Sequence, residues 1–406
     1  MRIAALAVLL LQVSVYADDW PQFRGAAGNA VSAEKEAPLE WGPGKNIRWK
    51  SPLTGGGNSS PIVSRGRVFV TIAEEQGKKR TLICLDRKTG ALLWSRSVAC
   101  AVEPTQEDNP HCGSTPCADG ERVIVWHYSA GLHCYDFDGK PLWNRDLGKL
   151  AHMWGYGSSP VLHGDHVLLN GGPGDRTFLT ALDKRTGATL WQHDEPGGDG
   201  KKWIGSWGSP VVVKIDGKDQ ILLGFPSRVK AFDPASGKVL WTCGGLGQLV
   251  YADIVVGNGM GVATGEDEGG DSIAFKLGGQ GDVTATQRLW NRRRPLEVST
   301  GLILDKHLWT VDNGGIIRCT EVESGKEVHK ERSPGGAAWG SIVSAAGRFY
   351  FTTRSGDTVV FSPDPKGIKV LAVNSLGEPS NATPAFSDGE IFIRTNRAVY
   401  CIEKPR

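Results

Sequence analysis

The segment LICLDRKTGALLW, residues 82–94, is written again three times further along the chain. The copies are LHCYDFDGKPLW (132–143), LTALDKRTGATLW (179–191) and VKAFDPASGKVLW (229–241). Each has alternating apolar residues, a turn with Asp and Gly, and a second apolar run that ends in Trp. This pattern is typical of two antiparallel strands joined by a tight turn. Self-similarity on this scale indicates a repeat architecture.

The Trp that ends each copy recurs at intervals of 45 to 50 residues, and His329 takes its place in a later copy. A Ser-Pro-like entry, a short strand, a turn and a second strand precede each quoted segment, so every copy holds four strands. Four strands within 40 to 50 residues is typical of a propeller blade. The recurring residues are Trp49, Trp94, Trp143, Trp191, Trp241 and Trp290.

A small residue precedes the turn of each copy, and this position can be located eight times. The eight positions are Cys84, Cys134, Ala181, Ala231, Ala274, Cys319, Val360 and Cys401. The sequence therefore predicts an all-β fold, an eight-bladed β-propeller of four-stranded antiparallel blades.

The two ends of the repeat region complete each other. The last copy ends with YCIEKPR (400–406) and lacks a fourth strand, whereas IRWK (47–50) is a fourth strand with no copy before it. Pairing these strands closes the ring and removes two open sheet edges. We expect a signal peptide at residues 1–17, an N-terminal extension at 18–46 and the propeller at 47–406.

The first residues have the pattern of a secretory signal. A positive start at Arg2 is followed by the apolar run 3–11 and by small Ala17 before Asp18. Nine apolar residues are too few to span a bilayer, so no transmembrane segment is expected. No Cys stands at the predicted cleavage site, so no lipid anchor is expected either. These features predict a periplasmic or secreted protein.

The repeated Trp is interpreted as structural. Neighbouring blades need a large rigid filler, and a buried indole N–H needs an acceptor. The Asp of each turn can accept backbone N–H groups, while Gly90, Gly187 and Gly237 can take a positive φ.

Eight cysteines in an exported chain raise the question of disulfides. Cysteines at the small position alternate with Ala in other copies and should lie too far apart to bond. The one bridge to consider is Cys100 with Cys112 or with Cys117. The net charge of +2 is small and gives no footprint for a nucleic acid partner.

No short catalytic motif is present. The chain lacks GxSxG, HExxH, CxxC and a phosphate loop ending in GK[ST]. The acidic stretch 265–271 offers Asp267, Glu268 and Asp271 as weak calcium candidates, but its spacing does not match an EF-hand, and a solvated turn is favoured. No metal site is expected.

The long connections, residues 95–114, 144–157, 170–178 and 192–206, all fall on one face of the predicted ring, called here the long-loop face. If the protein binds anything, it should bind there, over the central channel. These and the equivalent connections carry aromatic and His residues that could stack a planar ligand, grip a peptide or simply plug the channel. Asp253, Arg176 and Arg228 are the charged residues expected nearest the mouth. The candidate ligand residues are His111, His152, Trp154, Tyr156, Trp203, Trp207, Tyr251, Asp253 and Trp339.

The string [AC]LDxxTGxxLW resembles the repeat of pyrroloquinoline quinone (PQQ) proteins. WPQFRG, GSWGSP, GDVTATQRLW and SDGEIFIRT are similar to segments of exported PQQ-like β-propeller proteins of planctomycete-type bacteria. Quinoprotein dehydrogenases and the outer-membrane β-barrel assembly lipoprotein share the repeat. The chain departs from both: it has no adjacent Cys pair, against which the alcohol dehydrogenases stack PQQ, and no Cys to be lipidated after its signal. The resemblance implies the blade and leaves the chemistry open.

We therefore expect a non-catalytic exported propeller, monomeric and without cofactor, that binds a protein, peptide or small-molecule ligand on its long-loop face. The alternative is a PQQ-dependent oxidoreductase, with PQQ and calcium over the channel and the cofactor stacked on Trp154, Trp207 or Trp339. A third activity, hydrolysis or lysis of a polysaccharide, is supported only by carboxylates such as Asp253 and Asp267.

Overall fold

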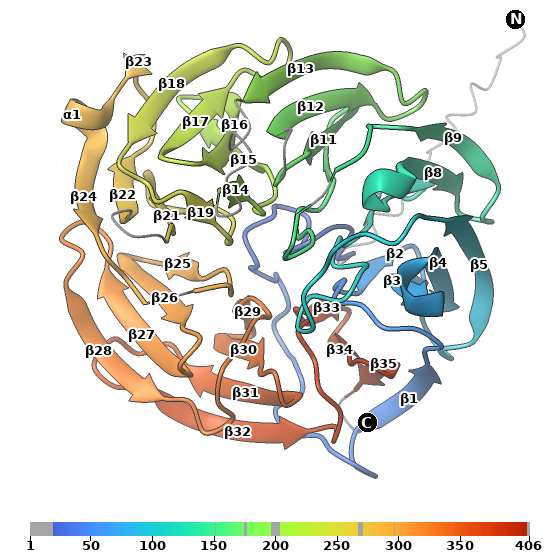
Figure 1. Cartoon of the computed structure of the whole chain (residues 1–406). Coiled ribbons are helices and arrows are strands. Elements are labelled where there is room, and N and C mark those ends of the chain that lie inside the picture. Colours follow the sequence, from blue (N-terminus) through green and yellow to red (C-terminus); the bar gives the residue numbers. More distant parts are fainter. Residues whose placement is uncertain are drawn as a thin grey trace, which may run out of the picture.

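Eight antiparallel sheets stand around a common axis, like the blades of a propeller (Figure 1). Seven of these sheets hold four strands and one holds five. The predicted eight-bladed all-β fold is therefore confirmed. The computed structural model describes residues 19–150, 152–173, 177–195, 204–266, 271–295 and 297–403, so the predicted signal peptide lies outside the described residues.

The first four blades follow the chain in order. Blade 1 holds β2 (Ile62–Ser64), β3 (Arg67–Glu74), β4 (Lys79–Asp86) and β5 (Leu92–Ala99), and blade 2 holds β6 (Cys117–Ala118), β7 (Arg122–Trp126), β8 (Leu132–Asp136) and β9 (Pro141–Arg145). Blade 3 holds β10 (Val161–His163), β11 (His166–Asn170), β12 (Thr177–Asp183) and β13 (Thr189–Glu195). Blade 4 holds β15 (Val211–Ile215), β16 (Lys218–Phe225), β17 (Arg228–Phe232), β18 (Val239–Gly244) and the added β23 (Gly281–Asp282).

The last four blades complete the circle. Blade 5 holds β20 (Val255–Gly257), β21 (Met260–Ala263), β22 (Ser272–Lys276) and β24 (Arg288–Arg292), and blade 6 holds β25 (Leu302–Leu304), β26 (His307–Val311), β27 (Ile316–Glu321) and β28 (Glu327–Arg332). Blade 7 holds β29 (Val343–Ala345), β30 (Arg348–Thr352), β31 (Asp357–Ser362) and β32 (Lys369–Ser375). Blade 8 holds β33 (Ala385–Ser387), β34 (Glu390–Arg394), β35 (Ala398–Ile402) and β1 (Ile47–Pro52).

A few short elements lie between the blades. The two-residue strands β14 (Gly205–Ser206) and β19 (Leu249–Val250) pair in parallel. The helical turns are η1 (Glu75–Gly77), η2 (Tyr128–Ala130) and α1 (Thr284–Gln287). Within the described part of the chain, no helix is long and apolar enough to cross a membrane.

Burial follows the position of a strand in its blade. Middle strands such as β34 and β35 are buried along their whole length, because neighbouring blades cover both of their faces. Outer strands such as β5 and β28 are largely exposed. The hydrophobic core is accordingly divided into clusters between adjacent blades, for example Phe69 of blade 1 against Val125 of blade 2. This burial explains the sequence pattern of the strands. Strands covered on both faces are nearly continuous runs of apolar residues, whereas outer strands mix apolar and polar residues.

The ring closes by pairing its first strand with its last. β1 runs antiparallel to β35, with Trp49 opposite Cys401, and the blue and dark red strands lie side by side in Figure 1. The fragment before the first copy and the incomplete last copy thus form one blade.

The repeated Trp joins each blade to the next. Trp94 Nε1 donates to the carbonyl oxygen of Phe137 at 2.9 Å, and Trp191 Nε1 donates to that of Pro234 at 2.9 Å. A Cβ added at Gly237 would lie 2.4 Å from the Trp191 ring, so this turn needs Gly both for its φ of +68° and for the close approach. The same bond joins Trp49 to Arg87, Trp143 to Lys184 and Trp290 to Val322.

Trp241 is the exception among the six. Its Nε1 donates to Gln220 Oε1 of its own blade at 2.8 Å. Blade 5 has no Asp-Gly turn at this place, and β23 instead pairs in parallel with β18, Trp241 lying opposite Gly281. Trp241 is fully buried, so it still fills the junction between blades 4 and 5.

The small position lies opposite this Trp on the neighbouring strand. Cys84 faces Trp94 and Ala181 faces Trp191, and a β-bulge follows each pair. The eight cysteines are all free thiols, so neither disulfide considered from the sequence is formed. Cys100 lies 3.9 Å from Arg80 Nη2, and Cys112 Sγ donates to the carbonyl oxygen of Ile72 at 3.1 Å.

Candidate functional site

A cavity of about 340 Å³ lies over the central channel on the long-loop face. All eight blades reach it, mainly through the connections that lead into the innermost strands. We call it the central cavity. Its lining combines aromatic rings, side-chain amides and hydroxyl groups, and Asp253 is the one charged side chain among the described residues that line it.

An aromatic cluster forms one side of the cavity. The Trp207 ring lies 5.2 Å from Tyr251 and 5.9 Å from Trp154, centroid to centroid, and Trp154 lies 6.1 Å from Tyr251. Trp207 is mostly buried, and its Nε1 donates to the carbonyl oxygen of Gly155 at 2.9 Å. Trp154 and Tyr251 are only half-buried, so part of each ring is left for a ligand. Trp339, from the connection between blades 6 and 7, adds a further ring.

A ring of short polar side chains surrounds the channel, one from the start of each blade. In seven of the eight steps around it, a backbone N–H donates to the side-chain oxygen of the next member, at 2.6 to 3.1 Å. We call it the hydroxyl ring. Its members are Ser60, Thr115, Ser159, Ser209, Asp253, Thr300, Ser341 and Thr383. The buried N–H groups around the channel are thus satisfied by the neighbouring blade.

Asp253 is the only carboxylate of the hydroxyl ring. It is 6% exposed, and its Oδ1 accepts the N–H of Ser209 at 2.6 Å. Burial raises the pKa of Asp253, while the positive charge of Arg24 and the bond from Ser209 act in the opposite direction. Burial also lowers the pKa of Arg24 to about 10, and Asp253 opposes this shift. The two groups form a buried pair of opposite charges at the channel.

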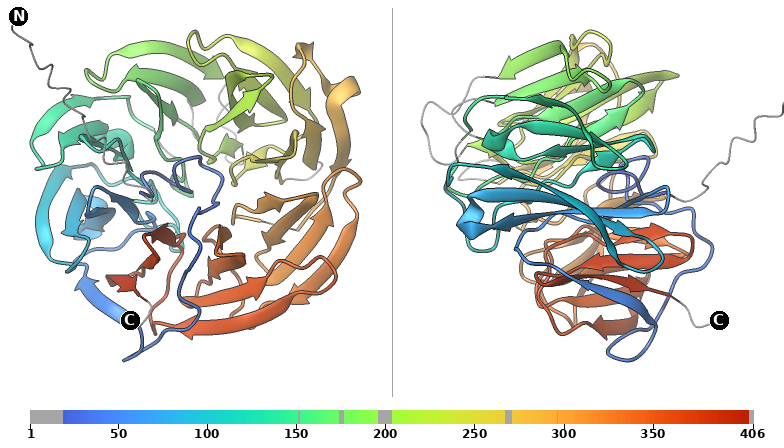
Figure 2. Two further views of the ribbon diagram at one scale, coloured as in Figure 1. Left: turned by 180° about the vertical axis from the view of Figure 1, so that it is seen from behind. Right: turned by 90° about the vertical axis from the view of Figure 1, so that its right-hand side faces the viewer.

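Arg24 belongs to the N-terminal segment, residues 19–46, which crosses the centre of the ring and then runs out to the rim, where β1 begins (Figure 2). The segment is held at both ends of this crossing, where Trp20 bridges to Val63 and Val31 bridges to Ser344. In between, Arg24 donates to the carbonyl oxygens of Gly28, Thr300 and Gly301.

Phe23 forms the floor of the central cavity. It lines both this cavity and a hollow of about 240 Å³ on the opposite, short-turn side of the segment. The segment therefore separates the two, and the central cavity opens toward the long-loop face.

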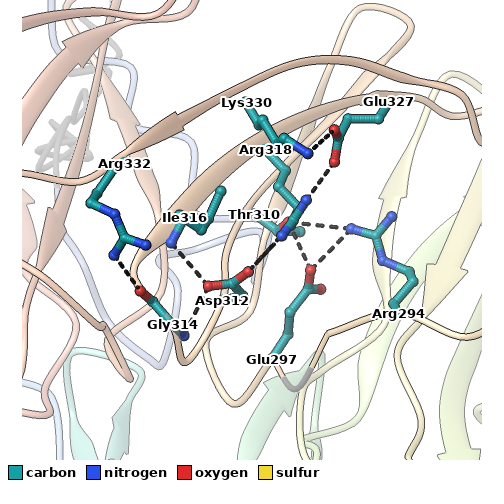
Figure 3. Close-up of polar contacts among 10 residues, drawn as sticks. All are labelled: Arg294, Glu297, Thr310, Asp312, Gly314, Ile316, Arg318, Glu327, Lys330 and Arg332. Atoms are coloured by element: carbon teal, nitrogen blue, oxygen red, sulfur yellow. Dashed lines mark hydrogen bonds and ion pairs between the residues drawn. The ribbon is translucent and has the colours of Figure 1, made fainter.

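Blade 6 holds its part of the cavity wall by a polar network (Figure 3). Asp312 Oδ1 accepts the N–H groups of Gly314 and Ile316, each at 2.9 Å, while its Oδ2 accepts from Arg318 Nη2 at 2.9 Å. These bonds shape the turn that carries the cavity residue Asn313.

The same network also holds the connection that leads into blade 6. Glu297 is 1% exposed, and its Oε1 accepts from Thr310 Oγ1 at 2.9 Å and from Arg294 Nη2 at 3.0 Å. It positions the segment with Val298 and Thr300.

The structure brings together six of the nine candidate ligand residues. These are Trp154, Tyr156, Trp207, Tyr251, Asp253 and Trp339. His152 lies behind the cavity lining, with its ring edge-on to Trp207 at 4.9 Å. Trp203 lies outside the described residues.

Two expectations about position are wrong. His111 is not in the cavity: it packs against Gly77 of η1 in blade 1, where burial lowers its pKa to about 4. Arg228 is exposed at the start of β17 and does not line the mouth. Arg176 lies outside the described residues, as do the calcium candidates Asp267 and Glu268. Asp271 is described, but its carbonyl oxygen accepts the N–H of Gly247 as part of the backbone pairing.

Sequence reasoning missed the amides and the floor. Asn58, Asn109, Asn313 and Asn381 line the cavity from four connections. A signal for two of them was available, because NSSP (58–61) and NATP (381–384) stand at the entry to their blades. Phe23 and Arg24 had no such signal, since they come from a non-repeating segment.

A family model described as outer membrane protein assembly factor BamB matches residues 39–106 and 78–331. No curated protein is similar enough in sequence to match the chain.

Solved structures share the architecture. The quinohemoprotein alcohol dehydrogenase from Comamonas testosteroni superposes with a TM-score of 0.65 at 13% identity, covering 96% of this chain and 81% of that one. BamB from Moraxella catarrhalis gives 0.55 at 13% identity, covering 88% and 94%. The computationally designed protein Ika8 gives 0.60 at 14%, covering 87% and 99%. At these identities the likeness shows the fold alone.

Proposed function

Since the chain belongs to the family described as outer membrane protein assembly factor BamB, we propose that it is a binding protein, with the central cavity as its ligand site. We further propose that it is exported and works in the periplasm or outside the cell, as its N-terminal pattern suggests. The protein named BamB in the structural comparison supports a binding role only at the level of the fold.

One observation carries the proposal: the central cavity is concave, closed by Phe23, and lined by half-buried aromatics and neutral polar groups. Small-ligand sites in proteins are typically of this kind, apolar with a few placed polar groups. A channel that was merely plugged would not need aromatic faces left open to solvent. The hydroxyl ring fixes the surrounding strands to one another and so makes the cavity rigid, which lowers the entropic cost of binding.

A quinoprotein function finds less support in the described residues. PQQ is a planar polycarboxylate, so its site needs a stacking surface and cations for the carboxylates. Trp154 could supply the surface, but the only charged lining residue described is the carboxylate Asp253. Arg354, the cation beside Trp339, is already ion-paired with Asp108. No group of three His, Cys, Asp or Glu residues in the described ranges could hold calcium. The described donor set therefore does not fit this cofactor.

The proposal can be tested by a thermal-shift screen of the purified full chain. The probes are neutral and charged sugars, amino acids and short peptides, nucleotides, fatty acids, and PQQ with calcium. We expect at least one class to raise the Tm by a few degrees at saturating concentration, because a ligand that binds only the folded state stabilises it. The rise should be absent in the double variant Trp154→Ala/Trp339→Ala.

Leu190→Ala is the matched control, because Leu190 is 48% exposed on the outer strand β13. It should respond like the parent chain, and the far-ultraviolet circular dichroism of all variants should coincide. An equal rise in the double variant would move the ligand site away from the cavity. No rise with any class would overturn the binding role, and dye-linked oxidation of alcohols with PQQ would replace it by the quinoprotein function.

A further inference from the structure

We propose that the ligand of the central cavity is the terminal ring of a neutral saccharide. The inference rests on the proposed function and adds the ligand class to it. It is carried by the charge of the cavity, by its amide, hydroxyl and aromatic lining, and by its closed floor.

The charge of the lining favours an uncharged ligand. Asp253 is the only charged side chain among the described lining residues, and no Lys or Arg stands there to bind an anion. A ligand carboxylate or phosphate would lie close to this carboxylate without a cation in the described lining, and like charges placed together are costly. The charge of Asp253 is already opposed by the positive charge of the buried Arg24, which weakens its attraction for a ligand cation.

The polar lining of the cavity favours a ligand whose groups both donate and accept hydrogen bonds. Side-chain amides and hydroxyl groups make up the polar part of the lining, among them those of Gln106, Asn109 and Asn381. A side-chain amide offers both N–H donors and an oxygen acceptor. A carboxylate can only accept and an ammonium can only donate, whereas a hydroxyl does both. A polyhydroxy compound therefore matches such a lining better than a ligand with one kind of charged group.

The aromatic rings supply the complementary apolar surface. A pyranose ring has flat patches of C–H groups between its hydroxyls, and these patches pack well on an aromatic face. Trp154 and Tyr251 are half-buried on one side of the cavity, and Trp339 is half-buried in another connection. Hydroxyl-binding amides beside open aromatic faces are the combination that a sugar ring needs.

The closed floor selects the end of a chain. Phe23 closes the cavity on the short-turn side, so a polymer can insert only a terminus. Both ends of a peptide are charged at neutral pH, and neither charge finds a free partner in the described lining. The end of a neutral saccharide carries no charge, so its binding does not place an unpaired charge in the cavity.

The experiment is isothermal titration calorimetry of the full chain with three sets of probes. The first set is neutral methyl pyranosides, covering the common hexoses, xylose and N-acetylglucosamine. The second is neutral di- and oligosaccharides reduced at one end, and the third is the matching uronic acids. We expect saturable binding of at least one neutral sugar and about tenfold weaker binding of its uronic acid. Stronger binding of the oligosaccharide than of the single ring would identify a polymer end as the source of the ligand.

Two variants connect binding to named side chains. Trp339→Ala removes a half-buried ring of the lining, and it should weaken the neutral sugar by about three- to tenfold. Trp154→Ala removes a face and should weaken it by about tenfold or more. Leu190→Ala should leave the affinity unchanged, and the Tm of each variant without sugar shows that it is folded.

The outcomes separate the two proposals. If no neutral sugar binds while another probe class loses its thermal shift in the cavity variants, the saccharide inference is wrong and the binding function stands. If a uronic acid binds as tightly as its neutral counterpart, the charge argument fails and with it the inference. If a bound sugar keeps the affinity of the parent chain in both Trp339→Ala and Trp154→Ala, the sugar lies elsewhere and both proposals fail.

Discussion

At the scale of single residues, Asp253 departs from a pattern that the rest of the ring keeps. Every other blade places Ser or Thr at this position, and in all of them except the blade of Ser341 the side-chain oxygen accepts an N–H from its neighbour. A carboxylate can accept the same bond but brings a charge into a buried place. Arg24 compensates for this charge from a segment outside the repeat.

Asp253→Asn tests this interpretation, because it keeps an oxygen for the Ser209 N–H and removes the titration. Burial raises the folded-state pKa of Asp253, so the parent chain loses stability as the pH rises from about 4, where the unfolded carboxyl ionises, through that higher pKa. The variant has no such loss. As the pH rises over this range, its free energy of unfolding should therefore increase relative to that of the parent chain. The increase should be about 1.4 kcal/mol for each unit by which the folded pKa of Asp253 exceeds the unfolded one.

Urea unfolding of both chains between acid and neutral pH measures the effect. A stability difference that stays constant over this range would show that the Asp253 carboxyl is not perturbed. Thr300→Ser, elsewhere in the hydroxyl ring, is the matched control and should show no change in pH dependence.

What could be predicted at this scale follows from repetition. The cavity aromatics Trp154, Trp207 and Trp339 were found because each precedes the recurring Gly-Ser or Gly-Tyr-Gly-Ser at a blade entry. Phe23 could not be found this way, since its position depends on a non-repeating segment crossing the channel. His111 was misplaced because its long loop folds back onto η1, and loop conformation has no periodic signal.

At the scale of the element, the outer strand and the turn of the next blade form one docking unit. The unit combines an indole N–H, a turn carbonyl and a Gly that leaves room for the ring. The turn itself is held by Asp233 Oδ1, which accepts from Ser236 N–H at 2.8 Å.

Two substitutions of Trp191 separate the contributions of packing and hydrogen bonding. Trp191→Ala should cost about 3–5 kcal/mol, because it empties the space between blades 3 and 4. Trp191→Phe keeps most of the filling and loses the bond to the Pro234 carbonyl, at about 1 kcal/mol. Chemical unfolding measures both. A loss below about 1 kcal/mol for Trp191→Ala would contradict the docking role.

One junction between blades could not be predicted from the repeat. The Trp positions and the strand count were predictable because covered strands and tight turns repeat with one period. The junction at Trp241 was not, since GDVTATQRLW replaces the usual turn with β23 and α1. Here tertiary pairing with β18 takes over from local turn chemistry.

At the scale of the whole molecule, residues 19–52 make two separate contributions to the structure. Residues before β1 carry Phe23, which lines the cavity, and Arg24, whose charge opposes that of Asp253, while β1 itself completes blade 8. Without β1, β35 would become an unpaired strand at the outer edge of blade 8.

Two truncations distinguish these contributions. A chain beginning at residue 33 loses the cavity floor but keeps β1, so it should still unfold in one cooperative transition at a lower temperature. A chain beginning at residue 53 loses β1 and should show no cooperative transition. Differential scanning calorimetry measures both, and a chain from residue 53 that melts like the parent would refute closure by β1.

The pairing of β1 with β35 also sets an order of events during synthesis. The strand that leaves the ribosome before every other strand of the ring must wait for the last one, because its partner residues 398–402 are translated some 350 residues later. Until then β1 has a free edge that can pair wrongly, and contacts of such long sequence separation form slowly. The nascent chain is therefore most exposed to misfolding just before its final blade is made, and a chaperone that covers residues 47–52 would protect it best.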